Sequence, residues 1–179
     1  MVQHRLPLRL ASGLIYFSIA LFSISITMSP SKARELVAFS ENYPPGTIII
    51  KQSERKLYFT MGTGSAVRYP IAIGREGKAW QGSAFVQGKV LSPAWSPPDD
   101  VRQDHPNFPS VIPGGSPRNP MGVAAITLSL PEVAIHGTTA SMRKSVGTAA
   151  SYGCIRMYNE DVMDLFHRVK VGTPVVAIP

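Results

Sequence analysis

Residues 47–60 read TIIIKQSERKLYFT, two short runs of β-branched and aromatic residues separated by a polar turn. Runs of this kind favour extended strands, and the three residues of the turn, Ser53, Glu54 and Arg55, are enough to reverse the chain. The segment therefore predicts a β-hairpin with strands over 47–52 and 56–60. A hairpin this early in the chain favours a fold made mainly of strands.

The same pattern recurs further along the chain. The turn GTGS at residues 62–65 leads into an expected strand over 67–73, which Pro70 places at a sheet edge or a bend because proline donates no backbone hydrogen bond. Further strands are expected over 84–90, 123–130, 133–136 and 175–178. The predicted fold is mostly β: a single domain resembling a β-sandwich or β-barrel, with one or two short helices.

One helix is expected near the C-terminus. Asn159 is expected to cap it, Glu160 and Asp161 favour its positive end, and Gly172 is expected to stop it. Apolar residues recur along it at helical spacing. They are Val162, Leu165, Phe166 and Val169.

Residues 91–121 interrupt this pattern, because eight of the chain's 16 prolines fall there. We expect no regular element in this proline-rich segment. A segment of this length without periodicity is usually a functional loop, a lid or an insertion. It is expected to shape a substrate cleft, the alternative being a surface connection between two strands.

The length, the composition and the first 33 residues together predict one exported domain. The 179 residues are 44% hydrophobic and 16% charged, which excludes general disorder. The first 33 residues combine basic Arg5 and Arg9, an uncharged stretch over 10–28 and small residues up to Ala33, which is typical of a signal peptide. The alternative is an uncleaved membrane anchor. A linker over 34–45 and one folded domain over 46–179 are expected to follow.

The net charge of +7 does not indicate a nucleic-acid partner. Three of the 18 basic residues lie in the first 33 positions, which contain no acid, so 15 basic residues face 11 acidic ones in the remainder. Basic runs interleaved with aromatics are missing from the sequence. A mildly cationic surface suits an anionic polymer such as a cell wall. Membrane contact is expected only if the N-terminal segment is retained.

The single cysteine, Cys154, excludes an internal disulfide and any multi-cysteine metal site, and we expect neither a metal nor a cofactor. His136 lies 18 positions earlier, and both residues neighbour a glycine. Acyl transfer by a thiol needs a nucleophile, which Cys154 can supply, and a base, which His136 can supply. The alternative reading is a buried core cysteine and a hydrogen-bonded core histidine.

Two neighbours of Cys154 support the acyl-transfer reading. Gly153 lacks a β-carbon, so the chain can bend there and direct backbone N–H groups at a developing oxyanion. Arg156, two residues beyond, shares the side of Cys154 in an extended segment and could bind a substrate carboxylate or favour the thiolate.

Four other residues that could carry chemistry are read as structural. His105 is expected to be a solvated loop residue and His167 to lie on the surface near the end of the helix. Trp80 and Trp95 could stack on sugar rings, but they are expected to pack inside the domain or its loop.

The motif HGT at 136–138, twelve intervening residues and SYGCIRM at 151–157 resemble the signature of the L,D-transpeptidase catalytic domain, also called the YkuD domain. The motifs NPMG at 119–122 and GTPV at 172–175 are also similar to that family, and the resemblance covers about residues 46–179. It implies a periplasmic enzyme of the bacterial cell wall that acts on peptidoglycan stem peptides through a cysteine acyl-enzyme. A second stem or a wall-anchored protein would be the acceptor. The alternatives are an L,D-carboxypeptidase, in which water is the acceptor, and a non-enzymatic wall-binding protein.

The resemblance also implies roles for single residues. Cys154 would be the nucleophile, His136 the base and the carbonyl of Gly137 the group that orients the imidazole. Four nearby residues would stabilise the turn, stabilise the oxyanion or bind the substrate. They are Ser151, Tyr152, Gly153 and Arg156. Many members of the family carry a second histidine where this chain has Tyr152.

Overall fold

The expected hairpin is present in the main sheet. In the computed structural model, which describes Met1 and residues 34–179, β2 (Ile48–Lys51) pairs antiparallel with β3 (Lys56–Gly62). The expected signal peptide lies outside the described residues, apart from Met1. The other expected strands are present. They are β4 (Ser65–Pro70), β6 (Gly82–Leu91), β7 (Ala124–Leu128), β8 (Ala134–His136) and β11 (Pro174–Ile178).

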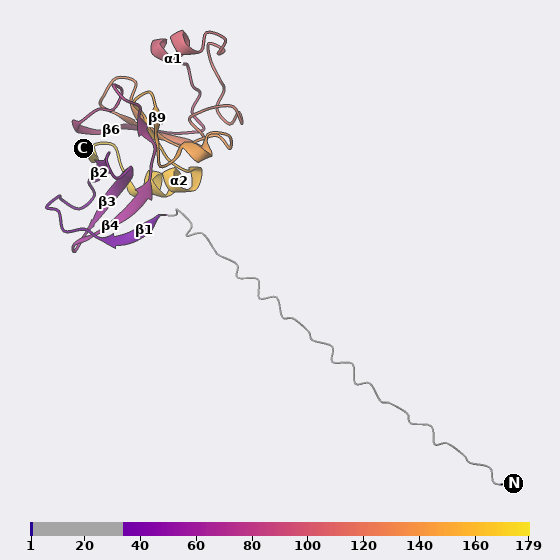
Figure 1. Cartoon of the computed structure of the whole chain (residues 1–179). Coiled ribbons are helices and arrows are strands. Elements are labelled where there is room, and N and C mark those ends of the chain that lie inside the picture. The colour runs from indigo at the N-terminus through magenta and orange to yellow at the C-terminus, as the bar shows by residue number, and fades with distance from the viewer. Residues whose placement is uncertain (2–33) are drawn as a thin grey trace. The chain divides into compact units, whose positions relative to one another are not determined.

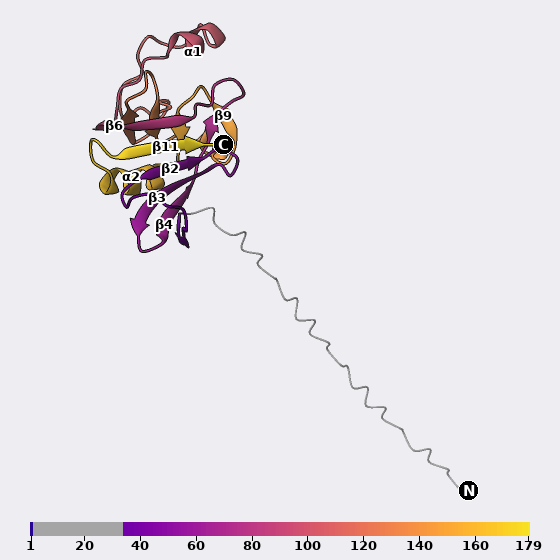
Figure 2. The same cartoon turned by 90° about the vertical axis from the view of Figure 1, so that its left-hand side faces the viewer.

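Nine strands form one mixed sheet in the order β1-β4-β3-β2-β11-β6-β7-β8-β10. Figure 2 shows β6, β11, β2, β3 and β4 following one another in this order. The expectation of a mostly β domain is confirmed. The sequence did not predict three short strands and one 3-10 turn. They are β1 (Glu35–Ala38), β9 (Ala149–Ser151), β10 (Ile155–Arg156) and η1 (Arg143–Ser145).

The sheet wraps around a single main core. Leu57 and Tyr69 from one half of the sheet and Ile126 and Ile135 from the other half belong to the same buried cluster. Helix α2 (Asn159–Arg168) joins it through an apolar face that includes Leu165. Removing this apolar surface from water is the main stabilising contribution to the fold. Figure 1 shows α2 beside the sheet, and α1 lies on the far side of β6.

Pro70 marks a bend rather than a sheet edge. The expected strand over 67–73 is divided there: β4 ends at Pro70, and β5 (Ile73–Gly74) pairs with β9 in a separate two-stranded sheet. The β4–β3 ladder ends at this residue, which has no N–H to donate. The outer side of β4 is covered by β1.

The residues expected to form a linker, 34–45, begin with a strand. Glu35–Ala38 form β1, antiparallel to β4, and Arg68 of β4 forms an ion pair with Glu35. Phe39, directly after β1, is buried against Tyr58. The strand exists because β4 offers a free edge, and local sequence gives no sign of such a partner.

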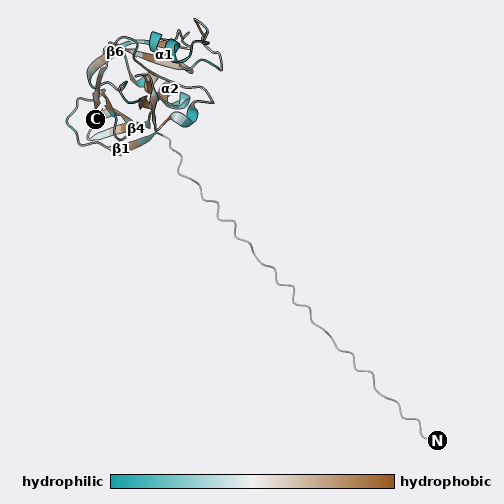
Figure 3. Cartoon of the chain, turned by 45° about the horizontal axis from the view of Figure 1, so that its top comes forward, coloured by the Kyte–Doolittle hydropathy of each residue, from teal (hydrophilic) through white to brown (hydrophobic). Residues whose placement is uncertain are grey.

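The proline-rich segment contains a helix that we did not expect. Helix α1 (Asp99–Asp104) begins after Pro97 and Pro98 and ends before Pro106. Prolines at a helix N-terminus do not break it, because the first N–H groups have no partner inside the helix. Helix α1 is hydrophilic, as Figure 3 shows. Among the described residues, none of the helices has the length and apolar character needed to cross a membrane.

Helix α2 has the expected position but neither of the expected ends. Its N-cap is Tyr158, and no side chain caps it. The side chain of Asn159 instead accepts a hydrogen bond from the N–H of Thr138, at 2.9 Å. The helix ends at Arg168, and Gly172, with a φ of 88°, lies in the turn that follows. A contact with the segment that follows β8 thus replaces the local cap.

Candidate active site

Cys154 lies at the end of a tight turn between β9 and β10. The Oγ of Ser151 accepts a hydrogen bond from the N–H of Gly153 at 3.2 Å and donates one to the carbonyl of Cys154 at 2.5 Å. Gly153 has a φ of 124°, a conformation that residues with a β-carbon rarely adopt. Ser151 and Gly153 therefore fix the backbone that presents the thiol. Because the N–H of Gly153 is already bonded to Ser151, it is not free for an oxyanion.

His136 lies at the end of β8, directly beside the strand that follows Cys154. Strands β8 and β10 are parallel neighbours, with His136 opposite Arg156. The imidazole is buried, with 4% of the residue exposed. Its Nδ1 lies 2.8 Å from the carbonyl oxygen of Gly137. If Nδ1 donates to that oxygen, Nε2 of the neutral ring is unprotonated and able to accept a proton.

The side chains of Cys154 and His136 line the same cavity, which holds about 540 Å³ and is partly open to solvent. Ser151, Tyr152 and Arg156 also line it, whereas Gly137 and Gly153 support the backbone behind it. The proline-rich segment supplies one wall of the cavity. Its lining residues there are Trp95, Pro98, Asp100, Val101, Pro120 and Met121.

Arg156 is a buried cation without a carboxylate partner among the described residues. The residue is 8% exposed. One guanidinium nitrogen, Nη1, donates to Ser145 Oγ at 2.7 Å, and the buried Nε has no partner within residues 34–179. An unpaired buried charge is costly unless a ligand compensates it. The cavity is therefore suited to an anionic group such as a carboxylate.

Burial sets the resting protonation states of the base and the thiol. It lowers the pKa of His136 to about 4, and the positive charge of Arg156 adds to this effect. Burial also raises the pKa of the Cys154 thiol above its ordinary value, although Arg156 opposes the rise. Both residues are therefore neutral at pH 7, and the Sγ–H donates to the carbonyl of Glu132 at 3.4 Å. A thiolate paired with a protonated imidazole at rest does not fit these shifts.

Tyr152 connects the cysteine turn to helix α1. Its hydroxyl donates to Asp104 Oδ2 at 2.6 Å, and the same oxygen accepts from Arg75 at 2.8 Å. These two contacts hold the pKa of Asp104 below its ordinary value. A second ion pair joins Lys78 to Asp100 at 2.7 Å. Together they attach α1 to the rim of the cavity.

Of the four residues expected to be structural, three are not among the residues that line the cavity, and the fourth, Trp95, is. His105 is exposed and stacks on Phe108, and His167 is exposed at the end of α2. Trp80 packs partly buried against the main core. Trp95 packs against Phe108 in an edge-to-face arrangement and also lines the cavity, so it can contact a ligand there.

Comparison with known proteins gives the family. The model described as "YkuD: L,D-transpeptidase catalytic domain" matches residues 45–176. The chain belongs to this family.

Both a similar sequence and a similar structure agree with the assignment of this chain to the YkuD family. "Probable L,D-transpeptidase YbiS" of Escherichia coli (strain K12) is 36% identical over 137 residues, 72% of this chain and 43% of the relative. The chain thus spans less than half of that relative's length. L,D-transpeptidase 3 from Mycobacterium tuberculosis has a TM-score of 0.58 at 16% identity, over 74% of this chain and 60% of that chain, which shows a shared fold.

One similar structure carries a different description. A chain from Brucella melitensis, described as a "Probable carnitine operon oxidoreductase caia", is 38% identical. Its TM-score is 0.55, over 84% of this chain and 96% of that chain. That description names a reaction class that neither the family model nor YbiS shares.

Two asparagines of the YkuD domain hold the site in place, and sequence reasoning gave neither this role. Asn119 is buried, and its amide donates to the carbonyls of Pro93, Ile112 and Pro113 at 2.8, 3.2 and 3.1 Å. It thus ties both ends of the proline-rich segment together. Asn159 accepts from Thr138, directly after the histidine strand. The NPMG motif was a signal for Asn119, but no local pattern predicted the contact of Asn159.

Gly122 packs closely against the backbone that follows His136, and replacing it by alanine is expected to destabilise the domain. A β-carbon there would lie 2.3 Å from the backbone nitrogen of Thr138 and 2.4 Å from Asn159 Oδ1, at a φ of 66°. We expect Gly122→Ala to lower the free energy of unfolding by about 3 kcal/mol or more. Urea unfolding followed by circular dichroism measures the loss.

Gly172→Ala is the matched control, because Gly172 has a φ of 88° and open space around its β-carbon position. It should lose only the backbone cost, about 1 kcal/mol. Equal losses in the two variants would show that the contact between residues 122, 138 and 159 is looser than the structure indicates.

Proposed function

We propose that this chain is a cysteine-dependent L,D-transpeptidase that acts on peptidoglycan stem peptides. The observation that carries the proposal is one cavity lined by Cys154, His136 and Arg156, in a chain that belongs to the YkuD family. These three residues supply a nucleophile, a base and a cation for a substrate carboxylate. No metal or cofactor takes part in the chemistry we propose.

The first half-reaction forms the acyl-enzyme. The neutral His136 takes the proton of the Cys154 thiol through Nε2 as the sulfur attacks the carbonyl carbon between an L-centre and a terminal D-residue. A C–S bond forms, and the C–N bond to the D-residue breaks. His136 then returns the proton to the departing nitrogen, so the D-amino acid leaves with a neutral amine and the imidazole is neutral again.

Two groups support the negative charge that develops during this attack. The backbone N–H of Cys154 is the donor that we assign to the oxyanion, since the N–H of Gly153 is bonded to Ser151. Arg156 binds the carboxylate of the donor and stabilises the thiolate as it forms. The carbonyl of Gly137 holds the imidazole at Nδ1 and keeps Nε2 free to exchange the proton.

In the second half-reaction an amine of another stem, or of a wall-anchored protein, attacks the thioester and restores the thiol. If water attacks instead, the same site is an L,D-carboxypeptidase. We further propose that the first 33 residues direct export to the periplasm and are cleaved before Arg34, with an uncleaved anchor as the alternative. Such a location would bring the site to the cell wall.

Mass spectrometry with purified tetrapeptide stems tests the function. The protein should gain the mass of a tripeptide acyl group on Cys154 and release the terminal D-amino acid. Adding an acceptor stem separates the reactions, because a transpeptidase then forms a cross-linked product and a carboxypeptidase forms only the tripeptide. A folded protein that gives neither adduct nor released D-amino acid would instead be a wall-binding module.

The pH profile of the reaction tests the state of the base. His136 must be neutral to accept a proton, and its pKa lies at about 4, below the ordinary value of 6.5. Activity is therefore lost only as the pH falls through about 4. We expect kcat/KM for D-amino acid release to change little between pH 7 and pH 5.5, about one unit below the ordinary pKa. Circular dichroism at each pH confirms that the protein stays folded. A midpoint near 6.5 would contradict a buried neutral base.

A further inference from the structure

Glu132 lies in the turn between β7 and β8, against the thiol of Cys154. Its carbonyl accepts the hydrogen bond from Cys154 Sγ at 3.4 Å. Its φ of 60° places a glutamate in the left-handed region, which costs about 1 kcal/mol for a residue with a β-carbon. Strain of this kind concentrates at functional sites.

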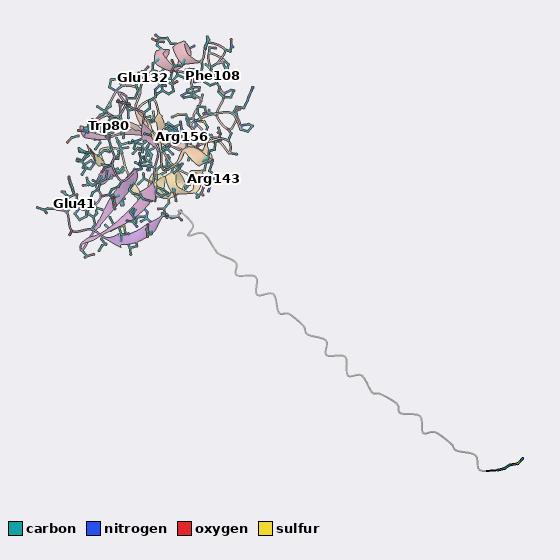
Figure 4. The ribbon with its side chains drawn as sticks, viewed as in Figure 1. Glu41, Trp80, Phe108, Glu132, Arg143 and Arg156 are labelled. Carbon is teal, nitrogen blue, oxygen red and sulfur yellow. The ribbon has the colours of Figure 1, made fainter. Side chains whose placement is uncertain are left out.

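Glu132 lies where two hollows meet. It lines the catalytic cavity and also an open groove of about 770 Å³ formed by residues 127–133 and Gln87. Figure 4 labels Glu132 and Arg156 in the half of the domain nearer α1. Because the two hollows share Glu132, a molecule in the groove would meet this residue before it reaches Cys154, and the proline-rich segment does not line the groove.

The charged residues that line the cavity lie at different depths. Glu132 is exposed and forms no ion pair with any residue of the described part of the chain, whereas Asp100, on the same cavity, is neutralised by Lys78. Arg156, at the buried end, likewise lacks a carboxylate partner there, and its Nε has no partner. The carboxylate of Glu132 is close enough to Cys154 to raise the pKa of the thiol. The buried end of the cavity thus carries an unpaired positive charge, and its exposed rim carries an unpaired negative charge.

We propose that Glu132 binds the ammonium form of the acceptor and positions it for attack on the acyl-enzyme. The inference deepens the proposed function and rests on it. Peptide and side-chain amines are largely protonated at neutral pH, since a lysine-type amine has a pKa of about 10.4. A carboxylate at the mouth concentrates such amines beside the thioester and favours them over water. Glu132 is a positioning residue, and its role is to select the acceptor.

In the acceptor step an amide bond replaces the thioester bond, and the amine loses two protons. The bound ammonium gives one proton to solvent through Glu132 and becomes a neutral amine. Its nitrogen attacks the thioester carbon, a C–N bond forms, and the C–S bond to Cys154 breaks. His136 takes the second proton from the nitrogen and returns it to the sulfur. The products are a new amide, the free thiol and one proton in solvent.

Chasing a preformed acyl-enzyme separates this role from the donor step. The Cys154 adduct is formed with tetrapeptide stem, and its loss is followed by intact mass after adding ethylamine, which is cationic at neutral pH, or hydroxylamine, which is largely uncharged. Glu132→Gln should slow the ethylamine reaction by about 3- to 5-fold and leave the hydroxylamine reaction unchanged. High salt should reduce the difference between wild type and variant, because the carboxylate is exposed.

Glu76→Gln is the matched control: Glu76 is an exposed glutamate that is not among the residues lining the cavity. It should react with both amines as the wild type does. Equal slowing of both amines by Glu132→Gln, slower adduct formation, or no change with ethylamine would overturn the acceptor role and leave the proposed function standing. If the wild type forms no adduct at all, the proposed function fails and the acceptor role with it.

Discussion

Replacing Cys154 by serine should abolish acyl transfer and leave the fold intact. A serine hydroxyl holds its proton far more tightly than a thiol does, and His136, with a pKa lowered to about 4, is too weak a base to remove it. We expect kcat/KM to fall by about 10³-fold or more. Release of D-amino acid from tetrapeptide stems measures the loss, and intact mass should show no acyl adduct.

Stability measurements separate this chemical effect from a structural one. The hydroxyl is smaller than the thiol, so it fits the same space, and it keeps a donor that faces the carbonyl of Glu132, so the Tm should remain close to that of the wild type. Cys154→Ala removes that donor as well and should be equally inactive. Because the chain has one cysteine, any adduct that persists in either variant must lie on another residue. Near-normal turnover in the serine variant would contradict the assignment of Cys154 as nucleophile.

Local sequence was sufficient to predict the elements whose stabilising interactions are themselves local. The β2–β3 hairpin depends on β-branched runs and a short turn, and the apolar face of α2 on helical spacing, so both were predicted. The bend at Pro70 follows from a missing N–H group. Strands β1 and β10 are too short to show a pattern, and each exists because a partner strand distant in sequence offers hydrogen bonds.

The same distinction applies to the candidate site. Motifs pointed to Cys154 and His136, which the structure places on one cavity. The side chain of Asn159 could not be placed in advance, because its partner Thr138 lies 21 residues away and the residue also fits a helix cap. The protonation states depend on burial and on the charge of Arg156, which only the folded chain defines. Sequence therefore named the candidate reacting groups, and the fold sets their protonation states.

Replacing His136 by glutamine should slow turnover by about 10²- to 10⁴-fold, the usual contribution of a general base. Glutamine can still donate to the carbonyl of Gly137 but cannot accept and return a proton at the position of Nε2. Because the Cys154 thiol has a raised pKa, little thiolate forms without the base. The rate of D-amino acid release measures the effect, and alkylation of Cys154 by iodoacetamide tests whether the thiol itself has become less reactive.

His167→Gln is the matched control, since His167 is exposed on α2, and it should react at the wild-type rate. Residual turnover in His136→Gln should rise with pH, because hydroxide and the small thiolate fraction replace the missing base, whereas the wild type should lose activity only near pH 4. A purely structural role for His136 predicts the opposite combination: a large loss of stability, with the pH profile of the remaining activity unchanged. Turnover close to that of the wild type would assign the proton transfer to another group in the cavity.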